Sequence, residues 1–551
     1  MASLAPAPSP ETPASPAPFQ RRLRVGVFAD GPLQPRWLVE AVAKVASSDF
    51  AQIVWGQTLN EKGNEKGVRS LFDPKRDLTP FPSREGLSPV WCAYRALDRK
   101  LFGSGDWSKP VALSKVVALS PDSACEPVDV VIALGDVPDE AIAAHAAHGV
   151  WRYCFGSDHG ICEADAGVAE VLEGADVTGS GLRVHLGADR GNRLVYQSWS
   201  RTQPFSVARS RDNLFAKTTE FLARALRDLH RGGPAWLDRA SRKLVPGTRF
   251  PKLMPGTDYS ISMAKRVAQR AIEKVAVVEQ WSLAFRFVDI EPWTGSLAGF
   301  HRLAPPHDGF WADPFPIQRN GKSYVFFEEL PAAKGRAHIS VMEVDREGRA
   351  SKPERVLERD YHLSYPFLVE DGGQLYMVPE TAENRTVEIY RCIDFPRRWR
   401  RERVLLDNLV AADATLHQAN GRWWMFANVA ANGAEIHDEL HVFTSDKLLG
   451  DWQPLAGNPV KSDVRGARPA GRLFTQGGKL YRPSQICAPL YGAGVALQRV
   501  TRLDDEFEEQ EERRIVPAQG EGVLGLHTIN RAGDLSVTDA FVRRPRLRLA
   551  G

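Results

Sequence analysis

Short apolar runs that alternate with amphipathic segments dominate the first part of the chain. "RLRVGVFADG" is a strand-like run that ends in a turn, and "PRWLVEAVAKVASSD" follows with apolar residues at helical spacing. "AQIVWG" and "VDVVIALGD" are two further strand-like runs, and the Ala-rich helix "PDEAIAAHAAHG" follows the second. Strands that alternate with helices are typical of a parallel α/β sheet. A Gly pair stops the last helix near residue 232, so we predict a Rossmann-like α/β domain over residues 22–232.

The pattern changes between residues 233 and 300, which we expect to form a linker. Pro and Gly are frequent there, and one helix is predicted over "SMAKRVAQRAIEKVAVVEQWSLAFRF". The start of this helix is basic and amphipathic, as in helices that touch a membrane surface. The ordinary alternative is a solvated helix that packs against one neighbouring domain.

From residue 301 onward the pattern is strand, glycine turn and strand, repeated five times. Further strands such as "AHISVMEVD" and "TVEIYRC" lie between these hairpins. The turn glycines recur at intervals of roughly 50 residues, and four strands at this period are what a β-propeller blade needs. We therefore predict an all-β, five-bladed propeller over residues 301–545. Its turn glycines are Gly321, Gly373, Gly421, Gly478 and Gly533.

Composition agrees with a multidomain globular protein. The 551 residues include 71 Lys and Arg and 68 Asp and Glu, and 43% are hydrophobic. This balance does not indicate nucleic-acid binding, and no apolar run approaches the roughly 20 residues of a transmembrane segment. Residues 1–21 are rich in Pro, Ala and Ser, and we interpret them as a disordered tail rather than a secretory signal. Six cysteines without metal-binding spacing favour a cytoplasmic location and no zinc site.

The propeller repeat places two acids at equivalent positions. Asp313 lies eight residues before the first turn glycine, and Asp413 lies eight before the third. The second and fourth repeats have Tyr365 and Ala470 at this position. Because the inner strand of each blade begins at the central channel, these positions converge on one funnel. We therefore expect both carboxylates to face one cavity.

Paired carboxylates suit glycosidic-bond chemistry, in which one acts as base or nucleophile and another as acid. The alternative is that Asp313 only caps a turn, because Asp is common in turns. Recurrence of the acid at one repeat position favours the functional interpretation.

Five blades, with one acid opening blade one and another opening blade three, resemble the family-43 and family-32 glycoside hydrolases. The resemblance implies that Asp313 is the base or nucleophile and that Asp413 is a modulating carboxylate. In those enzymes the general acid is a Glu around the fourth blade. The fourth repeat here, "DVRGARPAGRLFTQGGKLYRPSQ", has Arg465, Arg468 and Arg482 but no Glu. Ordinary glycoside hydrolysis therefore does not follow from the resemblance.

Residues 300–542 more closely resemble the propeller domain of the plant glucosamine inositolphosphorylceramide transferases and their bacterial relatives. The matching strings include "WADPF", "HLSYPF", "YMVPE", "DWQPLAGNPV" and "LYRPSQ". In the plant enzymes the established transferase fold is a separate domain, and nothing in this chain matches it. The resemblance thus predicts the propeller and a link to glycolipid synthesis, but not the activity.

Other polar residues on the same rim are candidates for the missing roles. Glu380 ends the second strand of blade two, and we align it with Glu329 of blade one. Either Glu could be the acid if burial raised its pKa; a structural Glu paired with Arg is the alternative.

The candidates for substrate binding come from four of the repeats. His362 and His527 could contact a sugar hydroxyl or phosphate, or could be structural. Arg468 and Arg482 fit a bidentate grip on a carboxylate or phosphate. Trp311 could stack on a sugar ring, although tryptophans in strands are more often core residues.

The α/β domain resembles the formyltransferase fold, on "VGVFADG", "DVVIALGD" and "TGSGLRVHLGADRG". The family's loop is matched by Asp189 and Gly191, but its His is displaced to His185. The family's Asn has no clear counterpart in "YCFGSDHG", which holds His159. We therefore interpret the domain as degenerate, serving binding or scaffolding. An active domain, with His159 or His185 in a relocated role, is the alternative.

These observations give three hypotheses for function. The first is a bacterial, cytoplasmic carbohydrate-active enzyme that builds or modifies a surface glycan or glycolipid. Its catalytic residues would be Asp313, Asp413 and Glu380, and its substrate a sugar, nucleotide-sugar or glycolipid. The second is an N-formyltransferase for an amino sugar nucleotide, which would use formyl-tetrahydrofolate; no other cofactor or metal is expected. The third is a glycan-binding scaffold without catalysis.

Overall fold

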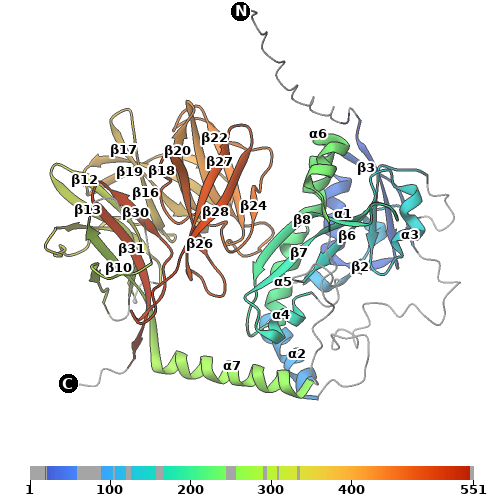
Figure 1. Cartoon of the computed structure of the whole chain (residues 1–551), viewed down its shortest axis with the longest axis horizontal. Helices are drawn as coiled ribbons and strands as arrows, with labels where there is room; N and C mark the ends of the chain where they lie inside the picture. The colour runs from blue at the N-terminus through green and yellow to red at the C-terminus, as the bar shows by residue number, and fades with distance from the viewer. Residues whose placement is uncertain are drawn as a thin grey trace, which may run out of the picture.

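The structure of the chain is a computed structural model. It describes residues 19, 21–58, 89–103, 106–119, 126–156, 166–243, 256–288, 295–306, 309–331 and 335–546. An α/β domain and a propeller lie side by side, and a long helix runs along one edge between them (Figure 1). The expected tail is outside the described residues, apart from positions 19 and 21, and so is His159.

The α/β domain is built on one seven-stranded sheet with the order β3-β1-β5-β6-β7-β8-β9. The first four strands in this order are parallel, as expected, and the other three form an antiparallel meander. The stretch that matched a formyltransferase loop is strand β7. The strands are β1 (Leu23–Ala29), β3 (Ala51–Thr58), β5 (Val130–Leu134), β6 (Val150–Phe155), β7 (Val177–His185), β8 (Asn192–Arg201) and β9 (Arg242–Lys243), and a small separate sheet pairs β2 (Leu33–Pro35) with β4 (Pro110–Ala112).

Helices pack on this sheet through apolar stripes. Trp37 of α1 stacks on Phe215 of α5 with ring centroids 5.0 Å apart, and Tyr153 of β6 meets its edge at 4.7 Å. The Gly pair expected to end the last helix instead kinks it: Gly233 has φ 61°, and the helix continues. The helices are α1 (Arg36–Ala46), α2 (Pro89–Phe102), α3 (Asp139–Ile142), α4 (Val168–Glu173), α5 (Val207–Thr218) and α6 (Phe221–Ala240).

The C-terminal region is a five-bladed β-propeller, as the repeat predicts. Blade one is β12 (Phe310–Arg319), β13 (Lys322–Leu330), β14 (His338–Val344) and β15 (Glu354–Leu357). Blade two is β16 (Ser364–Asp371), β17 (Gln374–Thr381), β18 (Thr386–Asp394) and β19 (Arg398–Leu406). Blade three is β20 (Ala411–Ala419), β21 (Arg422–Val429), β22 (Glu439–Ser445), β23 (Gln453–Pro454) and β24 (Lys461–Ser462). Blade four is β25 (Phe474–Gln476), β26 (Lys479–Ile486), β27 (Gly494–Leu503) and β28 (Phe507–Ile515).

Blade five closes the ring with a strand from before the first repeat. It contains β29 (Val523–Gly525), β30 (Ile529–Ala532), β31 (Leu535–Pro545), β10 (Val277–Phe287) and β11 (His301–Leu303). Strand β10 pairs with β31 along its whole length. The single helix predicted here is therefore α7 (Gly256–Ala276) followed by a strand, and the boundary expected at residue 301 cuts through blade five. Pairing with a strand more than 250 residues away in the chain overrides the local helical pattern.

The α/β domain docks on blade three, at and just before the start of β22, through buried charges. Lys217 Nζ of α5 lies 2.7 Å from Asp438 Oδ2, and both side chains are almost completely buried. Arg224 of α6 makes a two-pronged contact with Glu439 at 2.7 and 3.0 Å. These acids lie at the end of the propeller where the inner strands begin. The α/β domain is thus fixed beside the predicted funnel.

Candidate functional site

The predicted repeat position is a shared backbone feature. Asp313, Tyr365 and Asp413 have φ of 51°, 44° and 54°, and each lies at a break in the pairing of its inner strand. Left-handed backbone is uncommon for residues other than glycine and is often found at functional sites. The three blades therefore present equivalent, inward-turned residues at one end of the channel.

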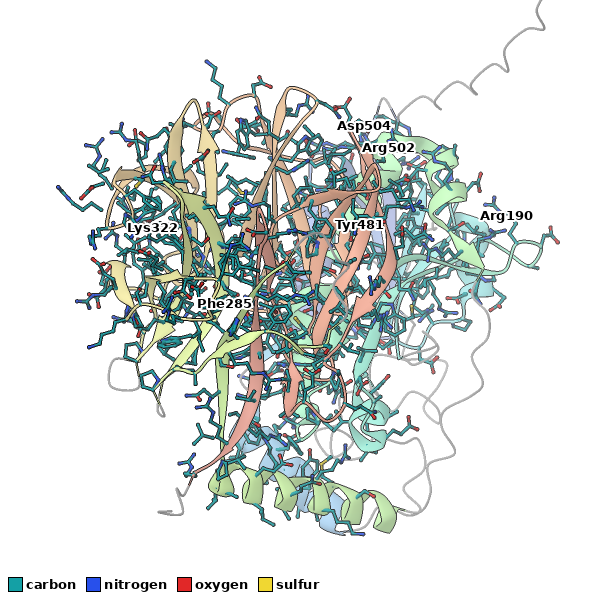
Figure 2. The ribbon with its side chains drawn as sticks, turned by 60° about the vertical axis from the view of Figure 1, so that its left-hand side comes forward. Arg190, Phe285, Lys322, Tyr481, Arg502 and Asp504 are labelled. Carbon is teal, nitrogen blue, oxygen red and sulfur yellow. The ribbon has the colours of Figure 1, made fainter. Side chains whose placement is uncertain are left out.

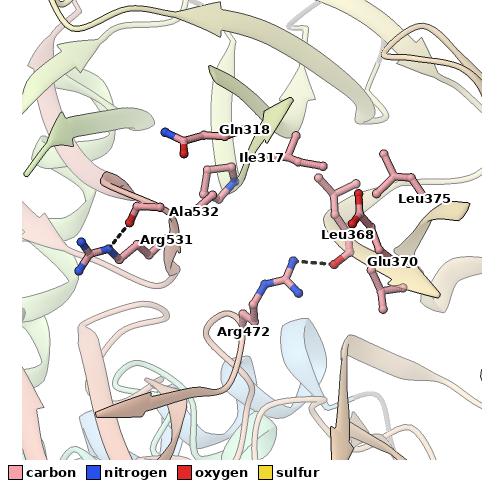
Figure 3. A pocket seen from close by; sticks show the side chains of 11 residues that line it. Ile317, Gln318, Leu368, Glu370, Leu375, Arg472, Arg531 and Ala532 are labelled. Carbon is pink, nitrogen blue, oxygen red and sulfur yellow. Dashed lines mark hydrogen bonds between the residues drawn. The ribbon is translucent and has the colours of Figure 1, made fainter. Parts of the chain in front are cut away.

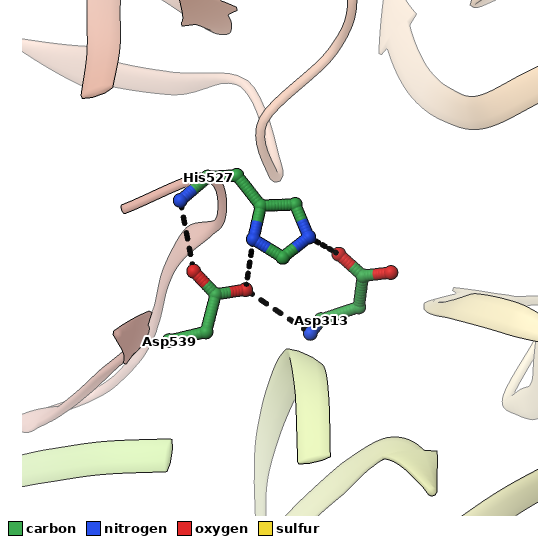
Figure 4. Close-up of side chains that lie close together, drawn as sticks. All are labelled: Asp313, His527 and Asp539. Carbon is green, nitrogen blue, oxygen red and sulfur yellow. Dashed lines mark hydrogen bonds and ion pairs between the residues drawn. The ribbon is translucent and has the colours of Figure 1, made fainter. Parts of the chain in front are cut away.

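Asp313 is held in a network with blade five. His527 Nε2 lies 3.1 Å from Asp313 Oδ1, and the Thr528 hydroxyl donates to the same oxygen at 2.7 Å. The Tyr365 backbone N–H donates to the other oxygen at 3.2 Å. On its far side, the His527 ring places Nδ1 2.8 Å from Asp539 Oδ2 (Figure 4). His527 thus lies between two carboxylates.

Charge pairing decides the protonation of this network. Burial alone would lower the pKa of His527, but Asp539 and Asp313 raise it to about 10. Burial acts to raise the pKa of Asp313, but the charge and hydrogen bond of His527, with Thr528 and Arg468, together outweigh it, so the pKa is lowered. At neutral pH the group is an imidazolium between carboxylates. Asp313, His527 and Asp539 are also close enough to surround a cation, which would have to displace the imidazole proton to bind there.

Asp413 organises a second group of charges. Arg468 donates to its carboxylate from Nε at 2.6 Å and from Nη2 at 3.2 Å, and Gln485 Nε2 donates to the same carboxylate at 2.8 Å. Glu380 Oε2 lies 3.3 Å from the same guanidinium. Burial raises the pKa of Glu380 well above its usual range, and the neighbouring Asp413 carboxylate adds to the effect. Burial and the neighbouring Asp413 thus favour the protonated form of Glu380.

A neutral histidine completes the surroundings of Arg468. Arg468 Nη1 donates to His437 Nδ1 at 3.0 Å, and the guanidinium lies over the Tyr491 ring at 5.1 Å. Burial lowers the pKa of His437 well below its usual value, and Arg468 lowers it further. His437 immediately precedes Asp438, the acid that binds the α/β domain. The domain interface and the site therefore share one loop.

The structure adds an acid that the sequence reading missed. Glu328 pairs with Ala312 across blade one, just as Glu380 pairs with Ser364 across blade two. The blade-one equivalent of Glu380 is therefore Glu328, and not Glu329 as aligned above. Both acids lie seven residues after their turn glycines, a spacing that could have identified Glu328.

Glu328 forms an ion pair with His362, whose Nε2 lies 3.0 Å from Oε1. Burial raises the pKa of Glu328. Burial alone would lower the pKa of His362, but Glu328 raises it. The His362 side chain keeps 36% of its surface exposed and that of Glu380 keeps 14%, against 5% for Asp313. His362 is thus the most exposed of these three side chains, and Asp313 is the least exposed.

The remaining expected residues lie elsewhere. Arg482 is fully buried, and its guanidinium binds Glu509 at 2.7 and 2.8 Å and the carbonyls of Gly466 and Ala467. Trp311 donates to Glu329 at 3.3 Å and packs on Phe327.

In the described part of the α/β domain, the two expected site residues differ in burial. His185 is buried at the end of β7, whereas Asp189 is exposed in the turn that follows. The formyltransferase resemblance stays a prediction.

A pocket of about 440 Å³ lies at the opposite end of the channel. Ile317 and Leu368, which line it, follow Asp313 and Tyr365 along the inner strands β12 and β16. Arg472, just before β25, lines it as well (Figure 3). Arg472 donates to the Leu368 carbonyl there at 2.6 Å. Tyr365 crosses the channel between the two ends, with its hydroxyl 2.8 Å from Thr415 Oγ1 and 2.7 Å from the Gly471 nitrogen. The acids therefore lie outside this pocket.

Comparison with known proteins separates the two halves of the chain. Residues 298–523 match the family model described as "Glucosamine inositolphosphorylceramide transferase 1, N-terminal". This confirms the family resemblance of the propeller. The family region ends before His527 and Asp539, so these two residues of the site lie outside the match.

Curated relatives of this N-terminal family come from plants. Glucosamine inositolphosphorylceramide transferase 1 of Oryza sativa subsp. japonica is 35% identical over 205 residues, which is 36% of this chain and 27% of the rice protein. The Arabidopsis thaliana protein of the same name is 31% identical over 206 residues, 37% of this chain and 27% of its own. The chain thus spans about a quarter of these relatives, which give no support to the bacterial origin expected above.

Solved structures with similar folds are glycoside hydrolases. A family 117 enzyme, Zg3597 from Zobellia galactanivorans, covers 49% of this chain and 91% of its own at 12% identity and a TM-score of 0.32. A thermostable family-43 glycoside hydrolase matches 38% of this chain and 77% of its own length, at 14% identity and a TM-score of 0.29. Scores this low carry no argument about chemistry.

Proposed function

We propose that the funnel of the propeller binds a sugar group and is the site of glycosyl chemistry in glycolipid or surface-glycan synthesis. The observation that carries this proposal is the contrast between two buried acids. The pKa of Asp313, 3.1 Å from His527, is lowered, and the pKa of Glu380, 3.3 Å from Arg468, is raised by burial and by Asp413. Paired carboxyl groups with pKa values pushed apart are the arrangement that general acid–base chemistry requires.

Each residue has a role in this proposal. Glu380 would give its proton to the oxygen of the leaving group. Asp313 would act as base or nucleophile through Oδ2, which accepts one backbone hydrogen bond. Asp413 would keep Glu380 protonated, and Arg468 would hold Asp413 in place. His362, at the mouth, would contact the substrate.

The substrate class is also part of the proposal. The names of the plant relatives combine glucosamine with inositolphosphorylceramide. An amino sugar donor and an inositolphosphoryl lipid acceptor are therefore the first pair to test. The matched region is only part of the plant proteins, so the test must measure transfer and hydrolysis separately.

A glycan-binding role without catalysis is the second candidate. It is favoured by the near-complete burial of Asp313 and Asp413, each of which is paired with a neighbouring cationic side chain. The two candidates differ in their response to Glu380→Gln. This substitution keeps the side chain uncharged but removes the carboxyl proton that an acid catalyst would donate.

The deciding experiment combines binding and turnover on the full chain. Nucleotide-activated glucosamine and N-acetylglucosamine would be titrated calorimetrically, with and without an inositolphosphoryl lipid, and products analysed by mass spectrometry. Catalysis predicts that Glu380→Gln binds but does not turn over, while Glu370→Gln, an exposed acid at the other end of the channel, behaves as wild type. Binding without turnover in the wild type would favour the second candidate. No sugar binding at all would refute both.

A further inference from the structure

Helix α7 presents its apolar face to solvent. Val267, Ile272 and Val275 are 46%, 68% and 75% exposed. At 100° per residue they lie on one side of the helix together with Ala264 and Ala268, which are exposed as well. A helix at the surface of a globular protein ordinarily turns such a face inward.

The polar face of α7 is the one that contacts the protein. Arg266 Nη2 donates to the carbonyls of Val171 and Leu172 at 3.0 and 3.1 Å. Arg270 binds Glu279 of β10 at 2.9 Å, and Arg543 of β31 binds Glu273 at 3.1 Å. The orientation of α7 is thus fixed by ion pairs, by hydrogen bonds and by the buried Met263 side chain, and the face with Val267, Ile272 and Val275 stays outside.

Helix α2 adds to this apolar surface. Leu97 and Leu101 are 55% and 60% exposed and lie on one side of α2 together with Lys100. Both helices lie at the same edge of the molecule, α2 beside the start of α7 (Figures 1 and 2). Six of the ten large apolar side chains recorded as exposed among the described residues belong to these two helices. Concentration of exposed apolar side chains in one area marks an interaction surface.

The charges around this surface select the partner. In the parts of α2 and α7 whose side chains are described, the exposed charged residues are Arg99, Lys100 and Lys265, all basic. An apolar face bordered by cations fits an anionic lipid surface, with the side chains in the acyl boundary and the cations among the headgroups. A second copy of the chain would bring like charges face to face.

The surface and the funnel are at the same end of the propeller. Strand β10 starts directly after α7, where Val277 pairs with Pro545 at the end of β31. In every blade the second strand ends where the inner strand begins, and Asp313 and Asp413 lie at the beginnings of theirs. Helix α7 therefore ends at the same end of the propeller as the acids.

We propose that α2 and α7 form a docking surface for an anionic membrane, with both helices lying in the plane of the interface. The described part of the chain contains no helix sufficiently long and apolar to cross a bilayer, so this contact would be peripheral. The proposal does not depend on glycosyl chemistry in the funnel.

Vesicle co-sedimentation of the full chain tests the proposal. Vesicles of phosphatidylcholine alone are compared with vesicles that contain about 30% phosphatidylglycerol, because anionic lipid attracts basic segments. We expect sedimentation with the anionic vesicles and weakening by salt. Two acids in the apolar face, Ile272→Glu/Val275→Glu, should reduce the bound fraction at least about tenfold. Val516→Glu, at a 52% exposed apolar residue of the propeller, is the matched control and should bind as wild type.

Two results would overturn the proposal. The first is unchanged vesicle binding: either the wild-type protein does not sediment with anionic vesicles, or the double variant binds them as tightly as the wild type. The other is a dimer, seen by light scattering, that Ile272→Glu/Val275→Glu converts to monomer, because this would assign the face to self-association. Circular dichroism and melting temperature verify that both variants are folded, which is expected at exposed positions.

Discussion

Asp313 and His527 form a buried ion pair, 3.1 Å apart, between the first and the fifth blade. They come from opposite ends of the propeller sequence, so the pair exists only when the ring is closed. It also fixes the charge of the carboxylate proposed as base or nucleophile.

Because of this pair, the free energy of unfolding should fall as the pH rises into the alkaline range. The pKa of His527 is raised from 6.5 to about 10 on folding, so its stabilising effect is complete below pH 6.5 and is lost as pH rises towards 10. His527→Gln should lower the free energy of unfolding by about 3–5 kcal/mol near neutral pH, because it leaves Asp313 and Asp539 without their cation. Urea denaturation at several pH values measures this. A gap between wild type and variant that stays constant from pH 6 to about 10 would contradict the assignment.

Asp413 should control the acid strength of Glu380. Its negative charge helps to hold the pKa of Glu380 above the usual range, so Asp413→Asn should lower that pKa. In an active assay the alkaline limb of the pH profile should move to lower pH. Carboxyl infrared difference spectra of the protein alone provide a readout independent of turnover. Asp371→Asn, an exposed change at the other end of blade two, should leave both unchanged.

The domain interface should depend on the Lys217–Asp438 pair. Lys217→Met leaves Asp438 buried without its cation and should cost about 3–5 kcal/mol of unfolding free energy. Arg422→Met removes the exposed ion pair between Arg422 and Asp505. This change should alter the free energy of unfolding by less than about 0.5 kcal/mol. Chemical denaturation followed by tryptophan fluorescence compares the two. Equal, small effects would mean that the domains are not held by this contact.

Strand β10 should exchange its amide hydrogens slowly, because each of its residues pairs with β31. Helix α7 is largely exposed and should exchange faster. Hydrogen–deuterium exchange measured by mass spectrometry would separate peptides from 256–276 and 277–287. Uniform exchange across both would favour the continuous helix that the sequence pattern predicts.

The sequence by itself determined the propeller and the shared position of Asp313 and Asp413. A repeat of about 50 residues forces equivalent residues into equivalent places, so the turn glycines of blades one and three fix the positions of Asp313 and Asp413. The first strands and helices of the α/β domain were predictable for a similar reason, because their apolar periodicity is local.

Only the tertiary structure decided which groups act on these acids. His527 and Asp539 reach Asp313 through ring closure, and Arg468 reaches Asp413 from the next blade. Contacts between residues so far apart in sequence leave no local pattern to read. The same reason explains why β10 is a strand and why the apolar face of α7 points outward: both depend on partners that the segment itself does not contain.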